Sequence, residues 1–204
     1  MSPQALDFHP LTPERWKDLE ALFGPHGAYS GCWCMFWRVR RADFARMNPG
    51  ERKAALQELT ARPLAPGLLA YAAGQPVGWV SLGPREDFAA LAHSRILPPV
   101  DDAPVWSIVC FFVTRSRRRQ GLLTELIRAA VQYAGAHGAT MVEAYPTDMQ
   151  SQRLAGVRLT GYSGYMGIAS AFREAGFVPL KQASETQLIM RCMVGDPDGR
   201  AVSR

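Results

Sequence analysis

The stretch CFFVTRSRRRQGLLTEL, residues 110–126, decides the fold. It begins in an apolar run, passes through four arginines in five positions, and reaches a helical pattern after Gly121. The whole apolar run, VWSIVCFFV at 105–113, is the strongest strand pattern in the chain, and it predicts a central strand covered on both faces. A helix that starts directly after such a strand presents unpaired N–H groups and the positive end of its dipole, which predicts a phosphate site.

Three interpretations of the arginines are open: a solvated helix entrance, a nucleic-acid patch, or one side of a phosphate cradle. The net charge of +5 fits an anionic partner but does not choose among them. Recognition of RNA or single strands usually needs exposed aromatic residues among the basic ones, whereas Phe111 and Phe112 lie in a predicted core strand. The loop has neither Gly-Lys-Ser/Thr nor G-x-G-x-x-G, which excludes a nucleotide triphosphatase P-loop. We therefore expect a phosphate cradle.

The segments before this stretch predict two helices and a hairpin. The segment TPERWKDLEALFG predicts a helix with Thr12 as its cap, proline at the first helical position and a stop at Gly24. NPGERKAALQELTARP begins with Asn48 and Glu51 arranged as a capping box. GLLAYAA and PVGWVSLG have period-two apolar patterns and are joined at Gly-Gln, 74–75, which predicts an antiparallel hairpin.

The segments after it predict strands alternating with helices. GLLTELIRAAVQYAGAHG predicts a long helix, TMVEAYP a strand, YMGIASAFREAGF a helix ending at Gly176, and TQLIMRCMV the last strand. The order predicts an α+β fold, in which helices cover one sheet. We expect a single domain over 1–194 and a disordered tail over 195–204.

Composition and cysteine positions predict a cytoplasmic protein with no membrane partner and no metal. Of the 204 residues, 48% are hydrophobic and 20% are charged. No apolar run approaches the roughly 20 residues that a bilayer span needs, and the N-terminus lacks the pattern of a signal peptide. Cys32 and Cys34 are too close together for an easy disulfide, while Cys110 and Cys192 lie in predicted strands. No second cysteine pair or His-x-x-x-His completes a zinc site.

The strand SIVCFFV, the turn TRSRRRQG and the helix LLTELIRAAV together resemble the acetyl-CoA-binding core of the GCN5-related N-acetyltransferases, the GNAT family. That core reads V-x-P-x-x-(R/Q)-x-x-G-x-(G/A), and Val113, Arg118 and Gly121 match it. Arg115 replaces the common proline, and Leu123 replaces the second small residue. The later segment AFREAGFVPL also resembles the family's helix and Gly-Phe turn.

The resemblance covers about 68–193 and implies both a fold and a cofactor. The fold would be a mixed, mainly antiparallel sheet with helices on both faces and a splayed strand pair at the cofactor cleft. Acetyl-CoA would be the co-substrate, held at its pyrophosphate by amides of the loop and helix start, and at its pantetheine and thioester by strand backbone. The cofactor-binding residues that we expect are Phe111, Phe112, Val113, Arg118, Arg119, Gln120, Gly121, Leu122, Leu123, Thr124 and Phe172.

In that family the acceptor amine attacks the thioester directly, and a tyrosine four residues before the Gly-Phe turn is the usual acid. This sequence has Phe172 at that position. The strand VEAYPTD places Glu143 and Tyr145 on one face, so we expect Glu143 as general base and Tyr145 as acid or substrate-holding residue. The alternative is a solvent-facing carboxylate and a packing tyrosine. Tyr162 and Tyr165 are further candidates for the acid.

The aromatic segment GCWCMFWR predicts the wall of the acceptor pocket. Trp33, Phe36 and Trp37 would enclose an amine, and Arg38 would hold a carboxylate. The same residues could instead be core contacts of the first two helices. The segment also resembles a Cys-Trp-Cys-Met-aromatic-Trp-Arg stretch of bacterial members of the family, and it names no substrate.

We therefore expect an acetyl-CoA-dependent N-acetyltransferase that acts on a small-molecule or peptidyl amine. A homodimer is a possible assembly, and we expect no nucleic-acid partner, because an RNA-binding module would rest on charge alone. The alternative is a non-catalytic acyl-CoA-binding or regulatory protein on the same scaffold, which Phe172 and Leu123 favour.

Overall fold

A seven-stranded sheet organises the chain in the computed structural model, which describes residues 5–157 and 164–195. The strands lie in the order β1-β2-β3-β4-β5-β7-β6, and every neighbouring pair is antiparallel except β4 and β5, which are parallel. The expected mixed, mainly antiparallel sheet is thus confirmed. The strands are β1 Leu6–Pro10, β2 Gly67–Ala72, β3 Gln75–Pro84, β4 Trp106–Val113, β5 Met141–Ala144, β6 Val178–Ser184 and β7 Gln187–Met193.

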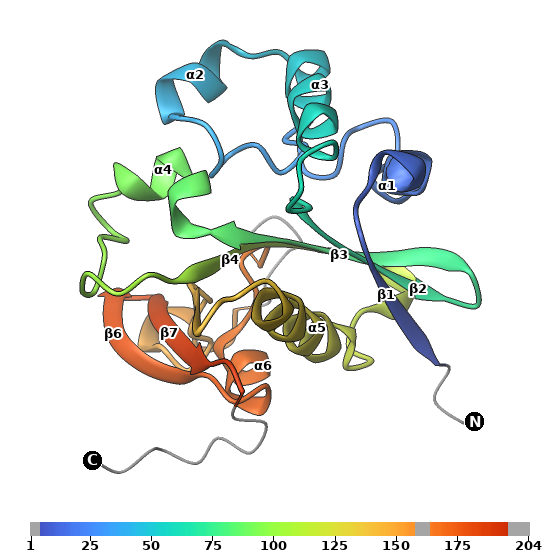
Figure 1. Cartoon of the computed structure of the whole chain (residues 1–204). Coiled ribbons are helices and arrows are strands. Elements are labelled where there is room, and N and C mark those ends of the chain that lie inside the picture. The colour runs from blue at the N-terminus through green and yellow to red at the C-terminus, as the bar shows by residue number, and fades with distance from the viewer. Residues whose placement is uncertain (1–4, 158–163, 196–204) are drawn as a thin grey trace.

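Helices cover both faces of this sheet, as expected. In Figure 1, α1 to α4 lie on one side of the sheet, and α5 and α6 lie on the other. None of the helices in the described part of the chain has the length and apolar character needed to cross a membrane. The helices are α1 Trp16–Phe23, α2 Arg41–Arg46, α3 Pro49–Leu59, α4 Ala89–Ala92, α5 Leu122–Ala136 and α6 Ala169–Glu174, with single 3₁₀ turns at Pro13–Arg15, Arg85–Asp87, Arg115–Arg117 and Gln152–Leu154.

Each face of the sheet has its own apolar core. On the α5 side, Leu126 and Ala130 pack with Ile108 of β4. On the opposite side, Leu19 of α1 and Leu56 of α3 belong to the second cluster. Side chains of a strand alternate between faces, so the central strands supply both clusters. This double burial explains why β4 is apolar along nearly its whole length.

A bulge in β4 breaks the alternation at a functionally important place. Its pairing with β3 shifts between Ser81 and Leu82, which face Cys110 and Ile108. Val109 and Cys110 consequently both belong to the core on the side of α1 to α4, while Phe111 belongs to the opposite core. The bulge thus sets which face Cys110 and Phe111 each occupy near the point where β4 leaves β5, because ordinary alternation resumes after it.

The expected splay of the strand pair lies next to this bulge. Parallel pairing joins Trp106–Ile108 to Val142–Ala144 and ends there. Farther along β4, the Phe111 N–H donates to the Tyr165 carbonyl at 2.6 Å instead of to a strand partner. The gap between β4 and β5 is thus partly filled by the segment that leads into α6.

Several local expectations are confirmed and others are wrong. The capping box of α3 is present, with Asn48 Oδ1 accepting from the Glu51 N–H at 3.0 Å and Glu51 Oε2 accepting from the Asn48 N–H at 2.7 Å. The hairpin turn is Ala73–Gly74 rather than 74–75, because both of these residues have positive φ and Gln75 already pairs with Ala72. Strands β1 and β6 and helix α2 were not predicted. Most of the expected disordered tail, 196–204, lies outside the described residues.

Candidate functional site

A first cavity, here called the cofactor cleft, lies where β4 ends and α5 begins. Its volume is about 360 Å³. The end of β4, the arginine loop and the first turn of α5 form one wall, and the start of α6 forms the other. The lining residues are Tyr29, Phe111, Val113, Arg117, Arg118, Arg119, Gly121, Leu122, Leu123, Thr124, Gly164, Ile168, Ser170, Ala171 and Glu174.

Backbone conformation explains the glycine in this cleft. Gly121 precedes α5 with φ +80°, a left-handed conformation that disfavours other residues. Among the described residues, no heavy atom lies within 4 Å of the position that a Cβ would occupy, so open space adjoins the backbone there. Arg119 also has positive φ, and the Arg118 Nε donates to the Val113 carbonyl at 3.2 Å. The loop therefore turns the chain sharply and exposes the first turn of α5.

Most of the expected cofactor residues line this cleft, and three do not. Phe112 packs against Phe23 and Tyr29 on the other face of the sheet. Gln120 donates from Nε2 to the Ser116 carbonyl at 2.7 Å, within the loop. Phe172 is fully buried between Phe111 and Phe177, so a direct contact with the cofactor is excluded by its packing. The expected cofactor-binding residues that line the cleft are Phe111, Val113, Arg118, Arg119, Gly121, Leu122, Leu123 and Thr124.

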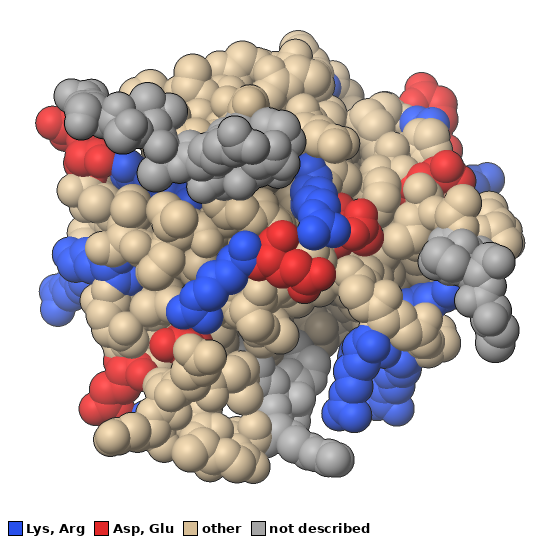
Figure 2. All heavy atoms as spheres, turned by 90° about the horizontal axis from the view of Figure 1, so that it is seen from below, with Lys and Arg blue, Asp and Glu red and all other residues tan. Residues whose placement is uncertain are grey.

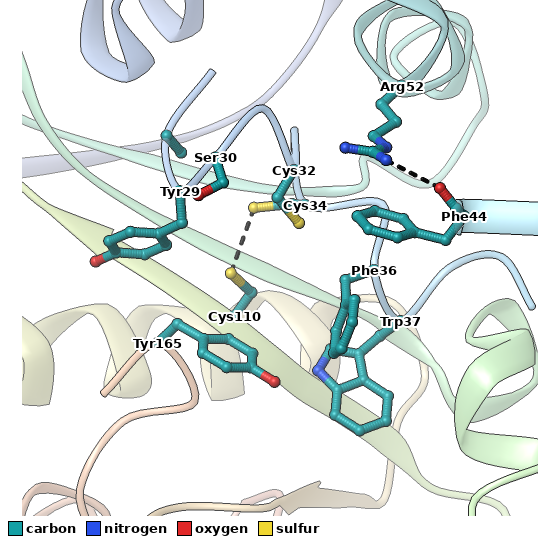
Figure 3. A pocket seen from close by; sticks show the side chains of 11 residues that line it. Tyr29, Ser30, Cys32, Cys34, Phe36, Trp37, Phe44, Arg52, Cys110 and Tyr165 are labelled. Carbon is teal, nitrogen blue, oxygen red and sulfur yellow. Dashed lines mark hydrogen bonds between the residues drawn. The ribbon is translucent and has the colours of Figure 1, made fainter. Parts of the chain in front are cut away.

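A second cavity, here called the acceptor cavity, lies on the opposite face of β4. Its volume is about 150 Å³. It meets the cofactor cleft at Tyr29, which lines both, and the neighbours Cys110 and Phe111 line one cavity each. Aromatic rings and thiols surround its interior (Figure 3). The lining residues are Ala28, Tyr29, Ser30, Cys32, Cys34, Phe36, Trp37, Phe44, Arg52, Cys110 and Tyr165.

Two of the four expected substrate residues line this cavity, Phe36 and Trp37. Trp33 instead stacks on Trp16 with ring centroids 5.9 Å apart and belongs to the core. Arg38 is buried and turned away, and its Nη2 donates to the Pro66 carbonyl at 2.6 Å and the Leu82 carbonyl at 3.1 Å. Burial lowers the pKa of Arg38 to about 10. Trp33 and Arg38 therefore do not line the cavity where we expected them.

Glu143 and Tyr145 share a face, as expected, but they lie in a buried ionic network. Glu143 is 0% exposed, and its Oε1 accepts from Arg85 Nη1 and from the Tyr145 hydroxyl, each at 2.8 Å. Its Oε2 accepts from Arg191 Nε at 2.9 Å. Neither Glu143 nor Tyr145 lines the acceptor cavity or the cofactor cleft. A carboxylate with both oxygens bound to arginines is poorly placed to act as the base.

Further contacts extend this network across the sheet. Arg191 donates two hydrogen bonds to Asp101, at 2.6 and 2.9 Å. These hydrogen bonds raise the pKa of Arg191. The Tyr145 hydroxyl lies 2.9 Å from Ser107 Oγ and also accepts from Arg85. Burial, followed by the charge of Glu143, raises the pKa of Tyr145 far above its usual value. The hydroxyl is consequently a weak acid in a closed set of partners.

Two tyrosines do lie where chemistry could occur. Burial raises the pKa of Tyr29 to about 12, and the nearby Arg118 guanidinium opposes that rise only in part. Burial also raises the pKa of Tyr165 to about 12, although the nearby Trp37 N–H favours its phenolate slightly. Both hydroxyls therefore stay protonated at neutral pH. Tyr162, the other candidate for the acid, lies outside the described residues.

Three thiols of the acceptor cavity form a small cluster. Cys34 Sγ lies 3.4 Å from Cys110 Sγ and accepts a hydrogen bond from Trp79 Nε1 at 3.1 Å. Burial and the neighbouring Cys34 raise the pKa of Cys32 to about 11. The hydrogen bond with Cys34 and burial hold the pKa of Cys110 well above its usual range. In the described part of the chain, no three His, Cys, Asp or Glu side chains are placed to hold a metal ion.

The sequence prediction missed several cavity residues. Tyr29, Phe44 and Arg52 come from separate segments before β2, none of which carried a catalytic or binding motif. Only the density of aromatic residues and cysteines between 29 and 44 was a signal in the sequence. The partners of this segment depend on how α2 and α3 fold over the sheet.

Charge on the α5 side of the molecule is mixed. In the view of Figure 2, Lys and Arg side chains lie next to Asp and Glu side chains rather than forming one continuous basic surface. Glu174 lines the cofactor cleft beside the arginine loop and accepts from Thr124 Oγ1 at 3.2 Å. The arginines thus belong to a local cleft with an acidic neighbour.

Comparisons with known proteins agree with this geometry. Residues 33–162 match the model of the acetyltransferase (GNAT) family. A solved structure of an uncharacterized protein from Bacillus halodurans is 15% identical, with TM-score 0.55 and coverage of 93% of this chain and 84% of that chain. AAC(6')-Ib in complex with ribostamycin and coenzyme A is 16% identical, with TM-score 0.55 and 98% coverage of each chain.

A third solved structure is PaiA N-acetyltransferase from Thermoplasma acidophilum in complex with coenzyme A, which is 14% identical. Its TM-score is 0.50, with coverage of 93% of this chain and 99% of that chain. At these identities the likeness shows a common fold. A search of curated proteins gives no match.

Proposed function

The chain belongs to the acetyltransferase (GNAT) family, and on that premise we propose that it is an acetyl-CoA-dependent N-acetyltransferase acting on a small-molecule or peptidyl amine. The observation that carries the proposal is the meeting of the cofactor cleft and the acceptor cavity at Tyr29. Acetyl-CoA as co-substrate is supported by the family match and by the coenzyme A in two complexes of the same fold.

The start of α5 would hold the pyrophosphate. The N–H groups of Leu122, Leu123 and Thr124 have no carbonyl partner within the helix, and the helix dipole favours an anion there. Arg118 and Arg119 line the same cleft and can add charge-assisted hydrogen bonds. The open space beside Gly121, described above, allows a phosphate to approach the backbone closely.

The pantetheine would follow β4, as in the family, and backbone contacts narrow the expected donors, Phe111 to Val113, to one. The Phe111 N–H already donates to the Tyr165 carbonyl. The Thr114 N–H donates to the Val77 carbonyl of β3. Because N–H directions alternate along a strand, the Val113 N–H faces the opposite side, toward the cleft. Val113 is therefore our candidate for the main-chain contact with pantetheine.

In the proposed reaction, the amine nitrogen attacks the acetyl carbonyl carbon, a C–N bond forms, and the C–S bond breaks. The nitrogen loses one proton and the sulfur gains one, so the products are an N-acetyl amine and the CoA thiol. Among the described residues, no carboxylate or imidazole lines the acceptor cavity. An apolar cavity disfavours the ammonium form by desolvation, so the amine would bind neutral and ready to attack.

Direct transfer is favoured over an acyl-enzyme on one of the cavity thiols. A cysteine nucleophile needs a depressed pKa or an adjacent base. Cys32 and Cys110 have raised pKa values instead, and no histidine or lysine lines the acceptor cavity. The cysteine side chains would then serve only as polarisable, apolar lining of the acceptor cavity.

Tyr29 would assist the departure of sulfur. Its pKa of about 12 exceeds the roughly 8.5 of a thiol, so complete proton transfer from Tyr29 to sulfur is unfavourable. A hydrogen bond donated by the Tyr29 hydroxyl to the charge that develops on sulfur needs no such transfer. We therefore assign to Tyr29 the role of charge-stabilising donor, in place of the usual family tyrosine, whose position Phe172 occupies.

Two measurements on the full chain test the proposal. Calorimetry with acetyl-CoA and with CoA should show saturable binding at moderate salt. Thiol release from acetyl-CoA should then exceed spontaneous aminolysis with at least one member of a broad panel of amines. The absence of any binding heat with either cofactor would overturn the proposal.

A non-catalytic acyl-CoA-binding protein is the second candidate, and one contact favours it. The Tyr165 carbonyl occupies the Phe111 N–H, a β4 donor at the splay that the family resemblance assigned to the thioester carbonyl. If CoA binds but no amine in a broad panel is acetylated above the rate without protein, this second function is the correct one.

A further inference from the structure

One buried donor of the acceptor cavity, Arg52 Nε, has no hydrogen-bond partner among the described residues. An unsatisfied buried donor costs about 1–3 kcal/mol, and nearly all such groups in native proteins have a partner. The indole N–H of Trp37, by contrast, is directed at the Tyr165 hydroxyl, and this contact opposes the rise of the Tyr165 pKa. The unpaired donor of Arg52 points to a ligand that brings its own acceptor atom.

Arg52 is held rigidly in place for such a ligand. Its Nη1 donates to the Gly31 carbonyl at 3.3 Å and its Nη2 to the Phe44 carbonyl at 3.0 Å. The guanidinium carbon lies 3.9 Å from the centroid of the Phe44 ring. These contacts fix the guanidinium plane without using Nε, so little side-chain entropy is lost when Nε meets an acceptor.

The charge around the cavity is positive. Arg52 is the one charged side chain among the described lining residues, and no Asp or Glu accompanies it. The Arg41 guanidinium carbon also lies 3.3 Å from the Phe36 ring centroid and 4.5 Å from that of Trp37. A guanidinium thus already contacts the ring faces of two cavity walls. A polycationic acceptor would find no anionic partner here, whereas a carboxylate would.

The size and walls of the cavity limit the body of the ligand. A volume of about 150 Å³ is small for a ligand site, and an apolar cavity of that size holds one benzene-sized ring. The rings of Tyr29, Phe36, Phe44 and Tyr165 face this space. An apolar ring fits these walls better than a polar sugar, whose hydroxyls would remain without partners.

The two ends of the cavity differ. Figure 3 shows Tyr29 on one side and Arg52, Phe44 and Trp37 on the other. The thioester would approach from the Tyr29 side, because Tyr29 also lines the cofactor cleft. The reacting amino group must therefore lie near Tyr29, and the oxygen acceptor of the ligand must lie near Arg52.

We infer that the acceptor is a monoamine with one ring-sized apolar body and, at the end far from the amino group, a carboxylate that pairs with Arg52. This inference rests on the proposed function, since it names the amine class that the reaction acetylates. It also separates this site from one that accepts polyamines or aminoglycosides.

Three phenethylamines that differ only in the para substituent test it. They are 4-(2-aminoethyl)benzoate with a carboxylate, 4-methylphenethylamine with a methyl group, and 4-(2-aminoethyl)benzylamine with an aminomethyl group that carries a second ammonium. With acetyl-CoA and wild-type protein, thiol release should give the carboxylate a kcat/KM about 10- to 100-fold above that of the methyl compound, as expected for charge-assisted hydrogen bonds. The diamine should be the poorest. Calorimetry of the same amines without acetyl-CoA should give the same order.

Variants locate the preference. Arg52→Gln should reduce the advantage of the carboxylate by about 10-fold, because it removes the unpaired donor and its charge. Arg46→Gln, at an exposed arginine on α2, is the matched control and should retain the full advantage. Arg52→Lys lacks the Nε donor but keeps the positive charge; it should reduce the advantage less, and it remains informative if Arg52→Gln fails to fold.

Equal kcat/KM and equal affinity for the carboxylate and methyl amines would overturn the inference. So would the diamine as best substrate, which would leave the proposed function intact. A carboxylate preference that persists undiminished in both Arg52 variants would overturn the assignment to Arg52. If no amine is acetylated but the carboxylate amine binds in an Arg52-dependent way, the cavity assignment stands and only the transfer reaction fails.

Discussion

Tyr29 lines both cavities, and its surroundings keep its hydroxyl protonated. Burial raises its pKa to about 12, while the Arg118 guanidinium in the adjoining cleft pulls the other way. Its ring packs against Phe112 at 5.6 Å between centroids, which orients the side chain at the start of the cleft. The role usually given to a tyrosine at the Phe172 position can thus come from a different segment of the chain.

Replacement of Tyr29 by phenylalanine should lower kcat by about 10- to 100-fold, which corresponds to one hydrogen bond to a charged group. The Kd of acetyl-CoA should change less than threefold, because the ring remains. Stopped assays of thiol release and calorimetry measure the two quantities. Tyr71→Phe is the matched control, since its hydroxyl donates to Asp18 at 2.6 Å and it lines neither cavity. Equal kcat for wild type and Tyr29→Phe would remove Tyr29 from the mechanism.

The pH profile follows from the same residue. With an alkylamine substrate, kcat/KM should rise as the ammonium loses its proton and should show no descending limb up to pH 10. Tyr29 has a raised pKa, so it remains a donor throughout this range. A descending limb with a midpoint near pH 8 or 9 would contradict this assignment.

The loss of folding stability at high pH sets the upper pH limit of that measurement. Tyr29 and Tyr165 both have pKa values of about 12 in the folded protein, above the ordinary value of 10. The unfolded chain therefore loses these protons first as the pH rises, and the contribution of both tyrosines to stability is lost between about pH 10 and pH 12. Assays below pH 10 avoid this loss.

At the scale of elements, α5 is the part of the cofactor cleft that the sequence predicts best. A strand, a turn, a glycine and a helix start follow one another within 110–126, and local rules suffice to place them. Glycines flank the helix at both ends: Gly121 has φ +80° and Gly138 has φ +85°, and neither has a heavy atom within 4 Å of a Cβ position. A residue with a Cβ would thus meet the same conformational cost at the end of α5 that adjoins the cofactor cleft and at its opposite end.

Gly121→Ala and Gly138→Ala should each lower the free energy of unfolding by about 1–2 kcal/mol, the cost of a left-handed conformation for a residue with a Cβ. Only Gly121→Ala should weaken acetyl-CoA binding, by about 10-fold or more, because its methyl group projects where the phosphates would lie. Urea unfolding and calorimetry measure the two effects. The pyrophosphate site would have to be placed elsewhere if both variants bound acetyl-CoA as well as wild type.

Other elements could not be predicted because their positions depend on distant partners. The segment containing Trp33 and Arg38 has no clear periodicity, and positive φ at Trp33 and Cys34 decides which side chains turn inward. Phe172 occupies the position of the family's usual tyrosine, and its packing against Phe111 and Phe177 removes it from the cleft. Arg52 sits on a helix whose sequence shows only its cap.

At the scale of the whole molecule, the Glu143 network links strands β4, β5 and β7 next to the splay. Glu143 pairs with Ser107 of β4 on one side and with Arg191 of β7 on the other, as main-chain neighbours. Its carboxylate binds Arg85, which also donates from Nη2 to the Leu97 carbonyl at 2.8 Å. We propose that this network holds the sheet in register rather than taking part in catalysis.

Glu143→Gln tests that role. The substitution leaves two arginines without a buried carboxylate, so the free energy of unfolding should fall by about 3 kcal/mol. The kcat/KM of the folded protein should stay within threefold of wild type. Glu185→Gln is the control, because Glu185 pairs with Arg153 at the surface and its side chain is 73% exposed. A loss of kcat/KM of a hundredfold in folded Glu143→Gln would restore Glu143 as the general base.

The central claim is that the two cavities bring acetyl-CoA and an amine together at Tyr29. The most direct measurement is mass spectrometry of an amine panel incubated with acetyl-CoA and the full chain, together with quantification of free CoA. We predict equal amounts of N-acetyl amine and CoA thiol, formed only in the presence of protein and at least tenfold more slowly with Tyr29→Phe. Saturable CoA binding without any acetylated product above the protein-free rate would contradict the claim.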